Sequence, residues 1–134
     1  MTKATLILCL LGAGGSLAIG FAGLGWTVMS VEDVLIFPLV MGPYAMLAGL
    51  TVWRRSKPKE VSVLAASVIL VIACGCWGFG TSLYRRHSLP DAVMVMDLSP
   101  LVVPALQWAF TSIVGIILGT RAAIASTMQR QEKV

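Results

Sequence analysis

Four stretches of this chain contain no charged residue, and all ten basic and six acidic side chains lie outside them. The stretches are Ala4–Val31, Val34–Trp53, Val61–Tyr84 and Leu98–Thr120, with 28, 20, 24 and 23 residues. An α-helix rises about 1.5 Å per residue and the hydrocarbon core of a bilayer is about 30 Å thick, so about 20 apolar residues cross it. Each stretch meets this length, and the sequence therefore predicts four transmembrane helices.

The composition agrees with a chain that lies almost entirely in lipid. Hydrophobic residues make up 57% of the sequence and charged residues 12%, and the mean hydropathy is +0.89; a soluble domain has about 25% charged residues. The longest polar connection, residues 85–100, is too short for a soluble domain. We therefore predict an all-α fold, an integral membrane four-helix bundle of two helical hairpins. It forms a single domain over residues 1–134, with spans at about 4–28, 34–53, 61–84 and 100–121.

The first span begins like a signal peptide, with a short basic segment, Met1–Lys3, before an apolar run. Apolar character continues through Gly25, however, well past the length of a signal-peptide core. We therefore expect this segment to be kept as a membrane helix.

The basic residues of the connections predict the orientation, because lysine and arginine favour the cytoplasmic side. With a cytoplasmic N-terminus, two basic residues fall outside, Arg85 and Arg86. Eight fall inside: Lys3, Arg54, Arg55, Lys57, Lys59, Arg121, Arg130 and Lys133. Both termini are therefore predicted to be cytoplasmic, in what we expect to be a bacterial cytoplasmic membrane. This bias also explains the net charge of +4, so the charge does not predict binding to nucleic acid.

The outer connection, residues 85–99, contains an apolar run from Ala92 to Met96. Such a run is unusual for a solvated loop. It predicts a short helix that lies on the outer membrane surface or packs onto a partner.

Small residues are the main packing signal, since close approach of backbones helps membrane helices to associate. Span four contains Ser112, Gly115 and Gly119. Span one contains two small-residue faces about 200° apart: Gly12, Ser16, Gly20 and Gly23 on one, and Gly14, Ala18, Ala22 and Gly25 on the other. Two such faces favour a helix held between its own bundle and another subunit. The alternative is that glycine and alanine are simply common in membrane helices.

Gln107 is the one strongly polar side chain at depth, with Thr111 one turn below it. We expect Gln107 to form an interhelical hydrogen bond, worth about 0.6 kcal/mol on average, with Tyr44 or Trp77 as partner. No span interior contains an acid, a lysine, an arginine or a histidine. Ion and proton pathways usually need such a group, so the sequence argues against proton-coupled transport.

The cysteines and the single histidine give no strong metal signal. Cys9, Cys74 and Cys76 all fall within spans, and buried cysteine commonly packs as a small apolar residue. His87 could form a soft-metal site with nearby methionines, but nothing in the sequence fixes its geometry. We expect no metal site and no cofactor.

No nucleophile lies near a base at a shared depth, so we do not expect an enzyme. The sequence favours a small accessory or structural subunit that stabilises a larger membrane complex by helix packing. The expected partners are the lipid bilayer and other membrane subunits, with a hetero-complex favoured over a homo-oligomer. A small oligomeric transporter or channel is the alternative, and a redox or pigment-binding membrane subunit is a third, weaker hypothesis.

Overall fold

A computed structural model describes residues 1–23, 31–88 and 99–131, and these segments are helical apart from short turns. The four elements are α1 (Thr2–Gly23), α2 (Val31–Trp53), α3 (Pro58–Ser88) and α4 (Ser99–Gln131). The prediction of an all-helical chain is confirmed. The predicted interfacial helix at residues 92–96 lies outside the described residues, as does Gly25.

Three of the helices are long and apolar enough to cross a membrane. The qualifying segments are Thr2–Phe21 in α1, Pro58–Arg85 in α3 and Leu101–Gln129 in α4. The described apolar part of α2, Phe37–Trp53, is shorter. These helices support the prediction of a membrane protein.

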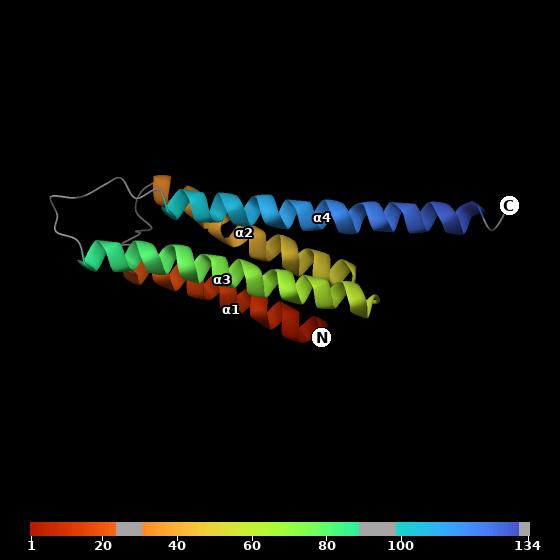
Figure 1. Cartoon of the computed structure of the whole chain (residues 1–134), viewed down its shortest axis with the longest axis horizontal. Coiled ribbons are helices and arrows are strands. Elements are labelled where there is room, and N and C mark those ends of the chain that lie inside the picture. Colours follow the sequence, from red (N-terminus) through yellow and green to blue (C-terminus); the bar gives the residue numbers. More distant parts are fainter. Residues whose placement is uncertain (24–30, 89–98, 132–134) are drawn as a thin grey trace.

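The helices lie side by side, with α1 and α4 on opposite sides of the α2 and α3 pair (Figure 1). Helix α1 packs against α2 and α3, α4 packs against the same two helices, and α2 and α3 also touch each other. Among the described residues, no Cα atom of α1 lies within 8 Å of a Cα atom of α4. Side chains from α2 and α3 therefore form the centre of the structure.

Two groups of buried apolar side chains fill this centre. The larger group includes Tyr44 and Leu47 of α2 and Leu64 of α3. The smaller group comprises Val40, Phe79 and Val103. Close approach between helices depends on glycine, because a Cβ at residue 12 would lie 2.5 Å from a ring carbon of Tyr44 and 2.7 Å from Ile72.

Helices α3 and α4 are longer than the uncharged stretches that predicted them. Helix α3 begins at Pro58, which suits the first helical position because its missing N–H would have no partner there. Helix α4 continues ten residues past the last predicted span residue, Arg121, as far as Gln131. A helix pairs its own backbone groups, so it can leave the apolar layer without interruption.

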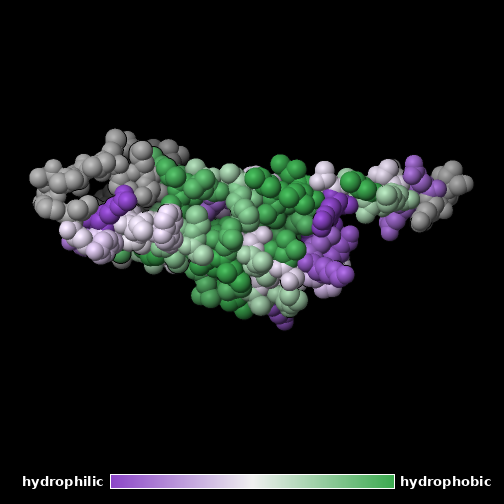
Figure 2. All heavy atoms as spheres, in the orientation of Figure 1, coloured by the Kyte–Doolittle hydropathy of each residue, from purple (hydrophilic) through white to green (hydrophobic). Residues whose placement is uncertain are grey.

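The distribution of apolar and polar residues over the surface agrees with this arrangement. Figure 2 shows hydrophobic surface along the middle of the packed helices and hydrophilic surface at the end that carries the α2–α3 turn. The N-terminus lies toward this end, and the C-terminal part of α4 projects beyond it (Figure 1).

Candidate functional site

Three polar side chains from three helices meet in the middle of the apolar core. Ser16 of α1, Tyr44 of α2 and Gln107 of α4 are 6%, 2% and 2% exposed. The Ser16 and Tyr44 hydroxyl oxygens lie 3.2 Å apart and share a hydrogen bond. The Gln107 amide lies beside these hydroxyls, because a Cβ placed at Gly75 would come close to Gln107 Nε2 and to both hydroxyl oxygens.

Helix α3 takes part in this polar cluster through its backbone. The Gln107 Nε2 group donates a hydrogen bond of 2.9 Å to the carbonyl oxygen of Val71. Gly75 makes room for the cluster, since a Cβ there would lie 3.1 Å from Gln107 Nε2 and 3.6 Å from the Tyr44 hydroxyl. The Gln107 Oε1 atom is buried and has no hydrogen-bond partner among the described residues.

Of the two partners that the sequence suggested for Gln107, Tyr44 lies beside it, whereas Trp77 is 75% exposed. Thr111 is fully buried, but its hydroxyl donates 2.9 Å to the Gln107 carbonyl of its own helix. Thr111 therefore does not link helices. The cluster itself consists of Ser16, Tyr44 and Gln107.

A second polar contact, which is partly buried, joins α2 and α4. The Trp108 indole N–H donates a hydrogen bond of 2.9 Å to the carbonyl oxygen of Leu39. The Trp108 ring lies directly over Gly42, where any Cβ would overlap it. The packing of α4 on α2 therefore requires glycine at this position.

At the end of α2 the chain makes a short turn, fastened by a buried arginine. Arg54 is only 7% exposed, and its guanidinium donates 2.6 Å to the carbonyl oxygen of Leu118 in α4. Its Nε atom lies 2.9 Å from a carboxylate oxygen of Glu60 at the start of α3. The guanidinium also stacks 4.4 Å from the centre of the Trp53 ring. Arg54 thus ties α2, α3 and α4 together.

The predicted small-residue positions of α1 divide between the interior and the surface. Gly12, Ser16 and Gly20 are buried, whereas Gly14 and Ala18 are exposed. A Cβ at Gly14 would meet nothing within 4 Å. The side chains of Ala22 and Gly23, like Gly25, lie outside the described set.

The small residues of α4 are partly covered. A Cβ at Gly115 would lie 2.7 Å from the Met46 side chain of α2, whereas one at Gly119 would meet nothing within 4 Å. Ser112 is half-buried. Close packing of α4 on α2 thus depends on the absence of a side chain at Gly115 but not at Gly119.

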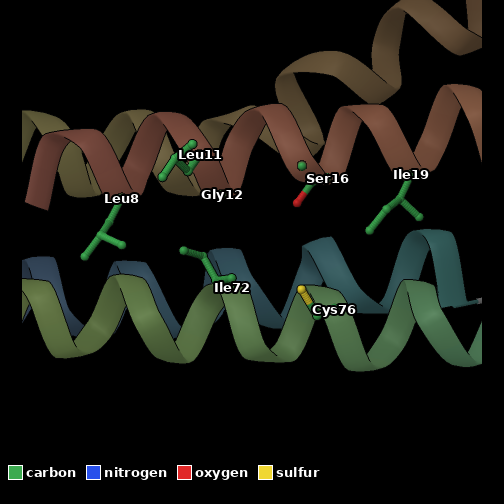
Figure 3. A pocket seen from close by; sticks show the side chains of 8 residues that line it. Leu8, Leu11, Gly12, Ser16, Ile19, Ile72 and Cys76 are labelled. Carbon is green, nitrogen blue, oxygen red and sulfur yellow. The ribbon is translucent and has the colours of Figure 1, made fainter.

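Two apolar depressions flank the polar cluster. One, about 290 Å³ in volume, lies between α1 and α3. The side chains that line it project from both helices, with the Ser16 hydroxyl turned toward α3 and Cys76 (Figure 3). The other, about 200 Å³, lies between α3 and α4 and is lined by Gln107 together with Leu70, Val71, Cys74, Leu106 and Phe110.

The cysteines and the histidine differ in their exposure. Cys9 is buried, Cys74 is half-buried, Cys76 is exposed, and all three are free thiols. His87 is exposed near the end of α3. Within residues 1–23, 31–88 and 99–131, no three His, Cys, Asp or Glu side chains group as a metal site would require.

The last part of α4 has no cover from the other helices. Leu118 is the last buried residue of the helix, and every described side chain after it is exposed or half-buried. Ile124 and Met128 are 56% and 63% exposed in this segment. We refer to Thr120–Gln131 as the α4 extension.

Sequence reasoning placed Gln107 at depth but missed the interactions of Arg54 and Trp108. Arg54 was counted only as a loop charge, although Glu60 six residues later could have suggested a paired turn. A signal for Trp108 existed in Pro43, because a proline inside a helix leaves a carbonyl in need of a donor. These two signals, however, do not show that Arg54 reaches Leu118 of α4 or that Trp108 reaches Leu39 of α2.

No protein-family model matches this sequence, and no curated protein or solved structure shows significant similarity to it.

Proposed function

We propose that this protein is an accessory subunit of a membrane complex, inserted as a four-span bundle with both termini in the cytoplasm. The orientation rests on the lysines and arginines of the N-terminus, the α2–α3 turn and the C-terminal segment, against two arginines at the far end of α3. In this orientation the α4 extension rises from the membrane into the cytoplasm. It reaches about 15 Å beyond Arg121, at 1.5 Å per residue.

The exposed apolar side chains of the α4 extension are the observation that carries this proposal. Ile117, Ile124 and Met128 fall within about 40° of one another at 100° per residue, so they form one stripe. Ile117 belongs to the lipid-facing part of α4, whereas Ile124 and Met128 follow Arg121 and would meet water. Exposed apolar groups outside the membrane are best stabilised by a partner that covers them.

The open face of α1 offers a second contact within the membrane. Gly14 and Ala18 are exposed, and a neighbouring helix could approach them closely. A helix from a partner subunit would gain dispersion contacts there that disordered lipid chains do not match. The proposed role is therefore structural. The subunit would contact its partners through the open face of α1 within the membrane and through the α4 extension in the cytoplasm.

The test is purification of the tagged full-length protein in mild detergent from its native membrane. We expect a larger complex to co-elute at fixed stoichiometry. An Ile124→Lys/Met128→Lys variant should lose it, and the matched control, Ala123→Lys/Thr127→Lys, should retain it. The control adds the same charge to the same helix at positions outside the stripe.

A second measurement separates an accessory role from the alternatives. Removal of the protein should weaken assembly of the complex while leaving its core reaction in place. Recovery of a lone monomer from native membrane would contradict the proposal. A homo-oligomer with its own ion or solute flux in liposomes would favour the transporter instead.

A further inference from the structure

The four basic residues of the turn between α2 and α3 differ in what neutralises their charge. Arg54 is buried, and its guanidinium is paired with the Glu60 carboxylate at 2.9 Å. Lys57 lies 3.8 Å from the same carboxylate and is 48% exposed. Arg55 and Lys59 are exposed and form no ion pair within the described part of the chain. An anion that neutralises these exposed cations must therefore come from outside the turn.

The turn concentrates positive charge in a short segment. Four basic side chains and one carboxylate leave a net charge of +3 on residues 54–60. Within residues 34–90, Glu60 is the only acid. Backbone hydrogen bonds keep the segment compact, since the N–H of Lys57 donates 2.9 Å to the Arg54 carbonyl. Clusters of this kind beside a membrane helix attract anionic lipid headgroups.

The neighbouring side chains place these cations at the level of the headgroups. Trp53 is 56% exposed, and its ring is held by the Arg54 guanidinium at 4.4 Å. Tryptophan is enriched at the boundary between membrane and water. The hydrophilic surface at this end of the molecule borders the apolar surface of the middle (Figure 2). The exposed cations follow Trp53 by two to six residues, so they lie where phosphates would be.

An exposed apolar strip runs along α3 from Lys59 toward the middle of the membrane. Val63, Ala66 and Leu70 are all exposed, and together with Lys59 they fall within an arc of about 60° at 100° per residue. From Lys59 to Leu70 the strip is about 16 Å long, at 1.5 Å per residue. This length is close to half the thickness of a hydrocarbon core, about 15 Å, which one acyl chain spans.

The strip ends at a hollow in the surface. Leu70 lines the apolar depression of about 200 Å³ between α3 and α4, together with Leu106 and Phe110 of α4. Exposed cations, an apolar strip and an apolar depression therefore follow one another from the membrane surface inward. One amphipathic molecule can contact all three.

We propose that this surface binds an anionic phospholipid. Its phosphate lies against Arg55, Lys57 and Lys59, and one acyl chain follows the strip to the depression between α3 and α4. The cations select the charge of the headgroup. The strip favours a lipid over a soluble anion, because a soluble anion would contact the cations alone. The site is separate from the α4 extension, so it can exist whether or not the protein is an accessory subunit.

The test is native mass spectrometry of the full-length protein in detergent, titrated with dioleoyl-phosphatidylglycerol or dioleoyl-phosphatidylcholine. The two lipids share their acyl chains and differ in headgroup charge. We expect phosphatidylglycerol to bind about fivefold more tightly, the equivalent of the 1 kcal/mol that one basic residue contributes near a membrane surface. Equal affinities would overturn the proposal. Soluble glycerol phosphate should not displace the lipid at equal concentration, and displacement would assign the site to a free anion instead.

Matched variants locate the headgroup. Arg55→Gln/Lys59→Gln should remove the preference for phosphatidylglycerol, and both side chains are exposed, so the fold should be kept. The control, Arg85→Gln/Arg86→Gln, takes the same charge from the far end of α3 and should retain the preference. Equal loss in the two variants, or a preference that survives Arg55→Gln/Lys59→Gln, would overturn the proposed site.

The path of the acyl chain is tested without a substitution. Phosphatidylglycerol with a photoactivatable diazirine in one acyl chain is bound to the full-length protein, and crosslinked peptides are mapped by mass spectrometry. We expect crosslinks on α3 between Val63 and Leu70, and on Leu106 and Phe110 of α4. Crosslinks spread evenly over the four helices would show that the strip does not hold the chain, which would contradict the proposal.

Discussion

The Trp108 indole N–H donates its hydrogen bond to the one backbone carbonyl that Pro43 leaves unpaired, that of Leu39. In an α-helix the carbonyl of residue 39 would accept from the N–H of residue 43, and proline has none. An unpaired carbonyl is costly in a lipid environment. A side chain of α4 thus compensates for a proline in α2 and fixes the two helices against each other.

Replacement of Trp108 by Phe should therefore destabilise the protein by about 1–3 kcal/mol, because the Leu39 carbonyl loses its donor. Pro43→Ala restores a backbone N–H, so the double variant should lose less stability than the sum of the single variants. The measurement is a double-mutant cycle of detergent unfolding, with exposed Trp77→Phe as the control. Strict additivity would show that Pro43 and Trp108 are energetically independent.

Gly42→Ala should be destabilising because its Cβ would overlap the Trp108 ring. We expect a loss of about 1–3 kcal/mol, typical of an overpacked core. Gly49→Ala is the matched control in the same helix, where a Cβ meets nothing within 4 Å. Alanine has the higher helix propensity, so this control should be neutral or slightly stabilising. Equal thermal stability of the two variants would contradict the close contact.

Glu60→Gln should destabilise the turn between α2 and α3, because it leaves the buried Arg54 guanidinium without its carboxylate. Loss of one partner from a buried pair costs about 3–5 kcal/mol, and the 17% exposure of Glu60 places the expected loss toward the lower value. Lys57→Ala is the control. Its contact with Glu60 is 3.8 Å long and the lysine is 48% exposed, so its loss should cost less than 1 kcal/mol. Thermal unfolding in detergent measures both.

Gln107→Leu should change stability by about 1 kcal/mol or less. The substitution removes the Val71 hydrogen bond, but it also removes the buried Oε1 atom that has no partner. The unfolded state in lipid finds other partners for the amide, which lowers the net loss further. Unfolding in detergent would test this expectation, and a loss of several kcal/mol would show that the polar cluster holds the fold together.

The topology is tested by single cysteines at Ser56 and Ser88 in a cysteine-free variant. Ser56 lies in the turn between α2 and α3, and Ser88 is the last residue of α3. A membrane-impermeant maleimide should reach Ser56→Cys only from the cytoplasmic side and Ser88→Cys only from the opposite side. Labelling of both from one side would contradict the proposed four-span topology.

The number and type of helices were predictable from the sequence because both follow from local composition. The uncharged stretches and their flanking charges identify segments that are stable only as helices in an apolar medium. The helix limits were less predictable. Helix α4 continues to Gln131 because helix formation does not stop where apolar character ends. Gln107 was recognisable as a polar group at depth because it lies well inside an uncharged, apolar stretch.

The amino-acid sequence by itself determined four helices, their apolar character and the presence of one amide at depth. Only the tertiary structure decided that Ser16, Tyr44 and Gln107 meet over Gly75, and that Trp108 reaches the carbonyl freed by Pro43. Helix formation depends on neighbours within about four residues, whereas these contacts depend on the rotation and depth of helices whose members lie 28 and 69 residues apart. All faces of such helices are apolar, so hydrophobicity does not select the buried face. Glycine positions and a few polar side chains select it instead.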